Sequence, residues 1–382
     1  DWSSDVCSSD LTLFVTNDFG PRAGGIETFV HGLIERFPLG TVIVYTSQQG
    51  DTKDYDKEWL DNFGVQVIRD RSKMLLPTPR VIWEVRKVVA KFQPKSLVFG
   101  AAAPLGLMGK FLNVPKKVAL THGHEVWWAK VPPFNFLMRI IGNSVDHLTY
   151  LGAYTKREIS KGLSSKAREA MIQIAPGIDT NKFKPVDSSK LRSELGLLDK
   201  EVIVSVGRLV PRKGQDQLIK ALPLVLEKHP KAHLLLVGTG KYKKTLDKLI
   251  ADRNLEKYVT FTGRVFYEEL ERYICLGDLF AMPSRSRLGG LEVEGLGIVY
   301  LEASACGLPV LGGDSGGAPD AVLHGATGLV VNGLDTKAIA EGLIKLLESD
   351  RKTMGNLGRK WTVENWDWQI WATKFVELVR GA

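Results

Sequence analysis

The feature that most constrains the fold of this chain is an alternation between short apolar runs and longer amphipathic segments. In the first half, segments such as 26–37 and 81–92 have apolar residues at every third or fourth position and separate the runs TLFVTND, TVIVYTS, VQVIRD, SLVFGA, KVALTHG and HLTYLG. The second half repeats the rhythm with EVIVSVGR, HLLLVG, VTFTGR, LFAMPS, PVLGGD and GLVV. This alternation is typical of parallel sheets covered by helices on both faces. The sequence therefore predicts an α/β protein with two doubly wound domains.

A polar, irregular stretch around residues 177–200 separates the two repeats. The chain of 382 residues is long enough for two domains of ordinary size. We expect an N-terminal domain over residues 12–180 and a C-terminal domain over residues 181–362. The final segment, residues 363–382, carries three tryptophans on a helical pattern and should pack as a helix, because such large surfaces are seldom left in water.

The opening segment DWSSDVCSSDL, residues 1–11, has the period of neither a strand nor a helix. It also lacks the basic and apolar regions of a secretory signal. Its sequence resembles the translation of a sequencing-adapter oligonucleotide. We therefore expect a non-native leader and begin the functional interpretation at residue 12.

Composition narrows the class of protein. No apolar stretch reaches the ~18 residues that span a bilayer. Cys7, Cys275 and Cys306 have neither CxxC nor Cys/His spacing, which argues against a disulfide framework or a zinc site and predicts a cytoplasmic protein. The net charge of +8 suits nucleic acid, an anionic membrane or phosphorylated substrates. Because the basic stretches lack interleaved aromatics, we expect no nucleic-acid partner.

The stretch VGRLVPRKGQD places three cations directly after a predicted strand. Arg208, Arg212 and Lys213 precede Gly214 and a predicted helix. Guanidinium groups and a lysine at the end of a strand match a diphosphate. A solvated basic loop is the alternative.

The stretch GGLEVEGLGIVYLEASACG sets Glu294 and Glu302 around the predicted start of a helix near Leu296. Each carboxylate oxygen can accept a charge-assisted hydrogen bond, so the pair suits sugar hydroxyls. Capping and surface charge are the alternative. In LGGDSGGAPD, glycines after another strand would let the backbone approach a ligand.

Two turns of the first half offer further candidates. Gly24 and Gly25 open a helix after the first strand, where backbone N–H groups can bind anions. His122 and His124 follow another strand, but HGHE is not the HExxH pattern of a zinc site, so we expect no metal. VGTGKYKKT lacks the spacing of a phosphate loop and predicts a turn before a basic helix.

Together, TNDFGPRAGGIE, FGAAAPLGLM, THGHE, GRLVPRKGQD, GGLEVEGLGIVYLEA and SGGAPD resemble family 4 retaining glycosyltransferases, in particular the actinobacterial phosphatidylinositol mannoside mannosyltransferases that use GDP-mannose. The resemblance covers nearly the whole chain after the opening stretch. Its most specific element is the pair Glu294 and Glu302 behind GRLVPRKG. It implies the GT-B architecture, in which two Rossmann-like domains face a central cleft and a C-terminal helix crosses back to the N-terminal domain.

The resemblance also implies a role for each matching position. The implied catalytic residues are His122, Arg208, Lys213 and Glu294. Donor binding would fall to Gly24, Gly25, Arg208, Lys213, Gly214, Gly263, Val265, Glu294, Gly295, Leu296, Gly297 and Glu302. The acceptor side would contain Asp18, Arg22, His124 and Trp127. One departure is Gly20, where relatives commonly have proline, and this exchange is expected to loosen the acceptor loop.

The implied reaction moves a hexose, mannose from GDP-mannose, to phosphatidylinositol or a phosphatidylinositol mannoside, with retention and without a metal or other cofactor. The apolar segment that follows Trp127 and Trp128 would receive the lipid, with peripheral association at the inner face of the cell membrane. Ordinary core packing of that segment is an open alternative. Two further sets of alternatives stay open. The transferase could use another nucleotide-sugar donor or a non-lipid acceptor, or the protein could be an epimerase or phosphorylase of the same architecture.

Overall fold

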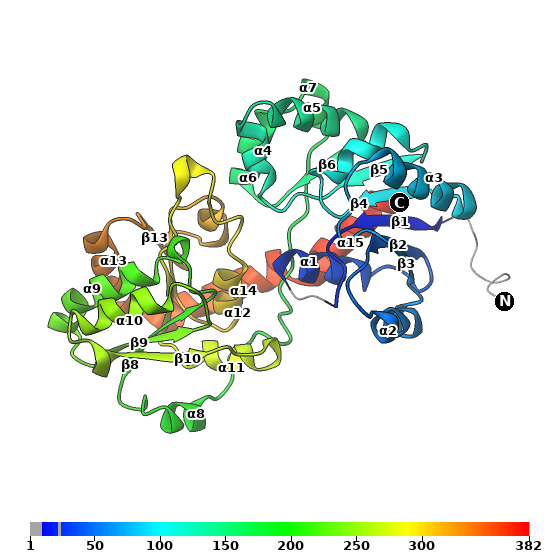
Figure 1. Ribbon diagram of the computed structural model, residues 1–382. Coiled ribbons are helices and arrows are strands. Elements are labelled where there is room, and N and C mark those ends of the chain that lie inside the picture. Colours follow the sequence, from blue (N-terminus) through cyan, green and yellow to red (C-terminus); the bar gives the residue numbers. More distant parts are fainter. Residues whose placement is uncertain (1–9, 22–23, 382) are drawn as a thin grey trace. The chain divides into compact units, whose positions relative to one another are not determined.

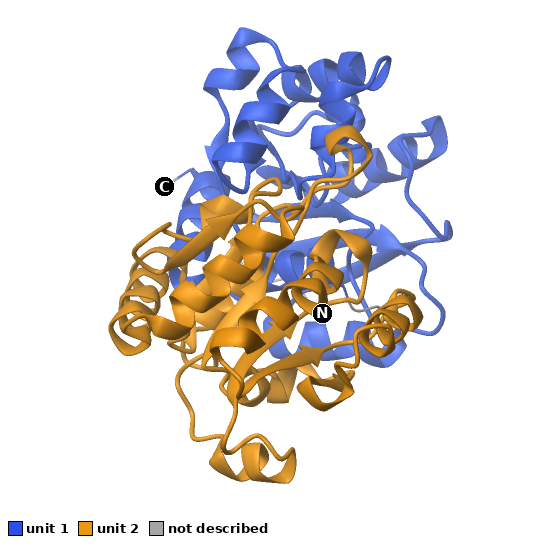
Figure 2. Cartoon of the chain, turned by 90° about the vertical axis from the view of Figure 1, so that its left-hand side faces the viewer, with its two compact units in different colours: residues 1–177, 368–382 blue, residues 178–367 orange. Residues whose placement is uncertain are grey.

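The computed structural model describes residues 10–21 and 24–381 (Figure 1). Cys7, most of the expected leader and Arg22 lie outside the described residues. The chain divides into two compact units, one formed by residues 1–177 with 368–382 and the other by residues 178–367 (Figure 2). Each unit is built on one parallel sheet with helices, so the predicted fold class is confirmed.

Unit 1 contains a seven-stranded parallel sheet with the order β3-β2-β1-β4-β5-β6-β7. The strand order changes direction between β1 and β4, and ligands of doubly wound sheets bind beyond the carboxyl ends of the strands at such a point. The five residues of β1 are all buried, as expected for a central strand covered on both faces. The strands are β1 (Thr12–Thr16), β2 (Val42–Ser47), β3 (Gln66–Asp70), β4 (Ser96–Phe99), β5 (Lys116–Ala119), β6 (His147–Tyr150) and β7 (Ile172–Gln173).

The helices of unit 1 include the final helix of the chain. They are α1 (Gly25–Ile34), α2 (Lys53–Phe63), α3 (Pro79–Phe92), η2 (Leu105–Phe111), α4 (Glu125–Lys130), α5 (Phe134–Ser144), α6 (Ala153–Ser160), α7 (Ser165–Glu169) and α15 (Trp368–Arg380). Helix α15 packs on α1, where a Cβ at Gly32 would lie 2.5 Å from the Trp368 ring. Phe375 of α15 is fully buried against Phe14 and Phe37. The tryptophan-rich tail thus completes the core of the first unit.

Unit 2 contains a six-stranded parallel sheet with the order β10-β9-β8-β11-β12-β13, which changes direction between β8 and β11. Its strands are β8 (Glu201–Val206), β9 (Ala232–Val237), β10 (Val259–Gly263), β11 (Leu279–Met282), β12 (Val310–Gly313) and β13 (Gly328–Val331). Its helices are α8 (Ser189–Glu194), η3 (Pro211–Lys213), α9 (Gln215–Lys228), α10 (Lys243–Ala251), η4 (Glu256–Tyr258), η5 (Tyr267–Glu269), α11 (Leu270–Ile274), η6 (Leu288–Gly290), α12 (Ile298–Ala305), η7 (Ala318–Ala321), α13 (Thr336–Glu348) and α14 (Arg351–Trp366).

Candidate active site

The loops that follow β8, β11 and β12 meet at the carboxyl edge of the unit 2 sheet, because these strands are neighbours. Backbone hydrogen bonds join the loops to one another. The Arg285 N–H donates to the Arg212 carbonyl at 2.8 Å, and the Gly317 N–H donates to the Glu294 carbonyl at 2.8 Å. The three sequence motifs of the second half therefore form one connected surface at the change of strand order.

Glycines make this close packing of loops possible. Gly214, which caps α9, has φ +78°, and a Cβ there would lie 2.1 Å from the Pro283 carbonyl oxygen. A Cβ at Gly317 would lie 2.1 Å from the Gly295 carbonyl oxygen. The glycines of LGGDSGGAPD were expected to let the backbone approach a ligand. In the structure, Gly317 lies close to the backbone of the glutamate loop.

Two cations share one carboxylate oxygen at the centre of this surface. Lys213 Nζ lies 2.7 Å from Glu294 Oε2, and Arg212 Nη1 lies 2.9 Å from the same atom. Burial of Glu294 opposes its ionisation, but the charges of Lys213 and Arg212 outweigh burial and lower the pKa of this carboxyl. Glu294 is therefore an ionised, oriented hydrogen-bond acceptor at neutral pH.

The second glutamate behaves differently. Burial raises the pKa of Glu302 to about 7, although the charges of Lys213 and Lys182 oppose this change. The field of Lys213 thus reaches both glutamates, and the site combines one ionised carboxylate with one that titrates near neutrality.

Helix α12 begins at Ile298, two residues later than the start expected near Leu296. Gly297 has φ +81°, and a Cβ there would lie 2.4 Å from the Tyr300 ring. Glu294 therefore lies in the loop before the helix, while Glu302 lies within it. The Tyr300 hydroxyl donates to the Met282 carbonyl at 2.7 Å, which ties the helix to the end of β11.

Arg212, Arg285 and Asp216 support these loops through contacts that the sequence pattern did not predict. Arg212 was grouped with the phosphate-binding cations, yet its guanidinium contacts Glu294. Arg285 forms a buried, two-pronged ion pair with Asp216 of α9, with both N–O distances at 3.0 Å. The position of Arg285 three residues after the strand LFAM was the one signal that could have identified it.

The other donor-side candidates are distributed over the same edge. Arg208 is exposed, and Gln215 donates to its carbonyl at 3.2 Å. Gly263 ends the edge strand β10, and its carbonyl accepts from the Gly238 N–H at 2.8 Å. Because β9 lies between β10 and β8, Gly263 and Val265 stand apart from the cluster around Lys213.

Unit 1 places the histidine motif at the carboxyl end of β5. The His122 ring nitrogen Nε2 lies 2.5 Å from the Gly100 carbonyl oxygen, at the end of β4. The Glu125 carboxylate accepts from the backbone N–H groups of His122 at 2.9 Å and Gly123 at 3.2 Å. Burial lowers the pKa of His122, so the ring is neutral at neutral pH. Glu125, which is fully buried and fixes this turn, was missed as a supporting residue.

The remaining unit 1 candidates surround this turn. Phe29 of α1 contacts the His122 ring edge to face at 5.6 Å, which brings the helix that follows Gly24 and Gly25 close to the histidine. His124 stacks on His122 with a ring separation of 6.2 Å. Asp18 lies on the loop after β1, where its N–H donates to Thr16. Half-buried Trp127 contacts the Phe134 ring at 4.5 Å.

Within residues 10–21 and 24–381, no group of three or more His, Cys, Asp or Glu side chains is arranged to hold a metal ion. Over the same residues, no helix is long and apolar enough to cross a membrane.

A family model described as "Glycosyl transferases group 1" matches residues 187–361, which lie within unit 2. The phosphatidylinositol monomannoside mannosyltransferase of Mycolicibacterium smegmatis, described as GDP-mannose-dependent, is 40% identical over 97% of this chain and 98% of its own length. The chain is a group 1 glycosyltransferase of family 4. A Corynebacterium glutamicum relative, the GDP-mannose-dependent monoacylated alpha-(1-6)-phosphatidylinositol monomannoside mannosyltransferase, is also 40% identical, over 98% of this glycosyltransferase and 99% of its own length.

The fold of the glycosyltransferase is likewise found in solved structures. The Anabaena protein Alr3699/HepE in complex with UDP superimposes with a TM-score of 0.80 at 21% identity, covering 97% of this chain and all of the other. The lipopolysaccharide glycosyltransferase WaaG superimposes with a TM-score of 0.68 at 19% identity over 97% of this chain. The GT-B fold predicted from the sequence motifs is thereby confirmed, and the region matched by the family model contains Arg208, Lys213, Glu294 and Glu302.

Proposed function

We propose that this glycosyltransferase moves mannose from GDP-mannose to phosphatidylinositol or a phosphatidylinositol mannoside, with retention at the anomeric carbon. The proposal is supported by relatives that are 40% identical over nearly the full length of both chains and are described as mannosyltransferases of this kind. The donor-binding part of the proposal rests on the buried cluster in which Lys213 and Arg212 share one oxygen of Glu294.

On the donor side, Arg208 and Lys213 hold the diphosphate, Glu294 binds hydroxyls of the transferring sugar, and Glu302 binds those of the ribose. Gly214 allows the diphosphate to approach the start of α9, and the backbone around Gly295, Leu296 and Gly297 contributes N–H groups. The backbone near Gly263 and Val265 meets the base.

Transfer breaks the bond between the anomeric carbon and a phosphate oxygen, so negative charge builds on the departing diphosphate. Preorganised cations lower such a barrier most where water is excluded, and Lys213 is buried. We assign this charge stabilisation to Arg208 and Lys213, without a metal ion. The departing phosphate oxygen then helps to take the proton of the acceptor hydroxyl on the same face.

On the acceptor side, neutral His122 contacts the reacting sugar, and Asp18 and His124 receive the inositol headgroup. The turn at Gly24 and Gly25 admits the donor phosphates or the acceptor. The segment from Trp127 through α5 lies against the membrane. Exposed Phe136 and the basic side chains of Lys130 and Arg139 suit an anionic lipid surface. The enzyme would thus act as a peripheral protein at the inner face of the cell membrane.

The deciding experiment incubates purified protein with GDP- or UDP-sugars and with phosphatidylinositol or its mono-mannosylated form, and identifies products by mass. We expect one added hexose that requires GDP-mannose and an inositol lipid, and loss of that product in Arg208→Ala and Lys213→Ala. Transfer from a UDP-sugar would overturn the donor assignment. Sugar-nucleotide interconversion without an acceptor would indicate an epimerase, and dependence on inorganic phosphate would indicate a phosphorylase.

A further inference from the structure

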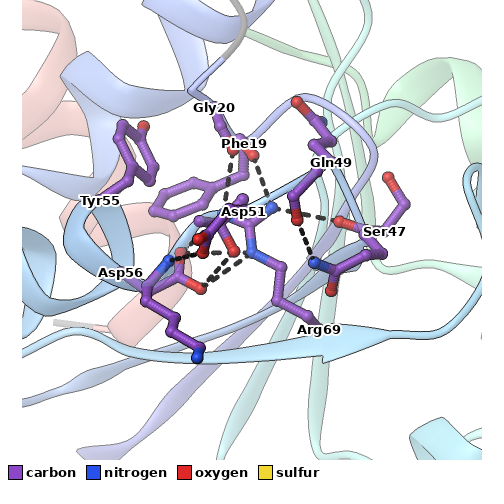
Figure 3. A network of polar contacts seen from close by, with 12 residues as sticks. Phe19, Gly20, Ser47, Gln49, Asp51, Tyr55, Asp56 and Arg69 are labelled. Atoms are coloured by element: carbon purple, nitrogen blue, oxygen red, sulfur yellow. Dashed lines mark hydrogen bonds and ion pairs between the residues drawn. The ribbon is translucent and has the colours of Figure 1, made fainter.

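The turn after β1 is held by a network centred on Arg69 of β3 (Figure 3). The Arg69 side chain is 8% exposed, and each of its three nitrogens donates hydrogen bonds. Nη1 donates to the carbonyls of Phe19 at 3.3 Å and Ser47 at 3.1 Å, while Nη2 donates to the Gly20 carbonyl at 3.0 Å. Asp56 of α2 completes the network with Oδ1 2.6 Å from Nη2.

The same turn is fixed from its other side by aromatic residues. The Phe19 ring is fully buried and lies 4.8 Å from the Trp59 ring and 5.1 Å from the His31 ring. The Gly20 N–H donates to His31 Nε2 at 3.3 Å. Burial lowers the pKa of His31 to about 4, so this ring is neutral at neutral pH and Nε2 is available as an acceptor.

Gly20 packs closely against the Tyr55 side chain. A Cβ at this position would lie 2.5 Å from the Tyr55 hydroxyl oxygen. Both the carbonyl and the N–H of Gly20 are hydrogen-bonded, and the Gln49 side chain donates to the Asn17 carbonyl at 3.2 Å. The glycine that stands here in place of proline is expected to loosen this loop. In the structure, main-chain atoms of residues 17, 19 and 20 form hydrogen bonds with Gln49, Arg69 and His31.

We infer that Arg69 is a positioning residue for the acceptor reaction, which it serves by fixing the main chain of residues 17–20. Asp18 lies within this loop, and it is one of the positions assigned above to the acceptor side. The inference rests on the proposed function for that assignment. Arg69 acts through the loop, because its donors are directed to protein acceptors.

A positioning role accounts for the chemistry of the network better than a contribution to stability does. Burying an arginine–carboxylate pair costs desolvation that its attraction barely offsets, so a well-packed apolar pair would stabilise the fold as well. An apolar side chain, however, cannot hold three main-chain carbonyls at fixed positions. Guanidinium has five donors in one plane, whereas lysine is a point charge with three rotating donors.

The test compares Arg69→Lys with Arg80→Lys in the full chain. Arg69→Lys keeps a positive charge beside Asp56 but loses the planar donor set. Arg80→Lys is a matched control, because Arg80 forms a similar two-pronged pair with Asp70 on the same strand and donates to Ser72 rather than to the loop carbonyls. Two readouts are needed, the amide exchange of residues 17–20 and the separate Michaelis constants for acceptor and donor.

For Arg69→Lys we expect amide exchange of the loop at least ~10-fold faster and a ~10-fold higher KM for the inositol-lipid acceptor, because two loop carbonyls lose their donors. The donor KM and the slow hydrolysis of donor without acceptor should stay within about twofold of the parent. Arg80→Lys should change neither the loop exchange nor the acceptor KM.

Unchanged loop exchange in a folded Arg69→Lys protein would overturn the inference, and so would faster exchange with an unchanged acceptor KM. If the protein accepted no inositol lipid at all, the proposed function would fail. The exchange result, together with the KM for whatever acceptor is then used, would still decide the role of Arg69. Arg69→Met provides a second variant, in which loss of all donors should enlarge both effects.

Discussion

Replacing Lys213 with methionine removes a buried cation while keeping a side chain of similar length. Lys213 Nζ and Arg212 Nη1 lie 2.7 Å and 2.9 Å from the same oxygen of Glu294. Breaking a buried ion pair by removing one partner costs about 3–5 kcal/mol when the other charge is left without compensation. Because Arg212 remains on Glu294, we expect the free energy of unfolding to fall by at most about 2 kcal/mol.

Turnover should respond far more strongly than stability. A preorganised donor aimed at charge that develops in the transition state is worth about 10²–10³ in kcat, or roughly 3–4 kcal/mol. Arg212→Met is the matched control, since it removes the other cation from the same Glu294 oxygen. If Lys213 binds the departing diphosphate, Arg212→Met should lose a similar amount of stability but less than about tenfold in kcat.

The assay measures initial rates with donor and acceptor both saturating, and urea denaturation of each variant. Equal losses of kcat in the two variants would show that Lys213 acts only by holding Glu294. A near-normal kcat in Lys213→Met, with the protein folded, would refute the donor-site reasoning altogether.

Three further predictions follow from burial and packing. The pKa of Glu302, raised to about 7, lies above its unfolded value, so the carboxyl stabilises the fold fully near pH 4 and loses this contribution as the pH rises through 7. The free energy of unfolding, measured by urea titration, should therefore change with pH differently in Glu302→Gln and in the parent. Relative to the parent, the variant should become more stable by about 2–3 kcal/mol between pH 4 and 8. A difference that stays constant with pH would contradict this effect of burial. Gly214→Ala should lower the Tm and raise the donor KM, because the new Cβ meets the Pro283 carbonyl. The control is Gly196→Ala, at a glycine with φ +67° and open space around it, which should lose only about 1 kcal/mol of stability. Equal losses of stability in the two variants would rule out the clash. Phe375→Ala should lower the free energy of unfolding by about 3–5 kcal/mol, measured by denaturation, and a loss below about 1 kcal/mol would disprove its place in the core.

Much of the fold could be predicted from the sequence because the strands of a parallel sheet are buried on both faces. Such strands appear as continuous apolar runs, as in TLFVT and AHLLLV, and the helices between them keep an amphipathic period. The position of the candidate site could be predicted from the sequence for the same reason. GRLVPRKG and the glutamate segment each come directly after a predicted strand, and the carboxyl ends of parallel strands share one edge of the sheet.

The supporting side chains could not be predicted in this way. Arg285 and Asp216 are 69 positions apart, and Arg69 meets carbonyls 49 and 50 positions away. Such contacts depend on the order of the strands and on the placement of each helix, which local patterns do not contain. Helix α12 starts two residues after the expected position, because Gly297 before it has a left-handed backbone and lies against the Tyr300 ring, which the local pattern does not contain.

The final helix gives the chain an unusual order of assembly during synthesis. Unit 2 is continuous, and all of its strands and helices have been translated by residue 367. Unit 1 begins first, yet α15 supplies part of its core only after residues 368–380 have been translated. During synthesis the first unit therefore cannot complete its core until Trp368 and Phe375 have been translated, after every strand and helix of the second unit. Loss of Trp368 and Phe375 would therefore damage the unit whose strands lie at the other end of the sequence.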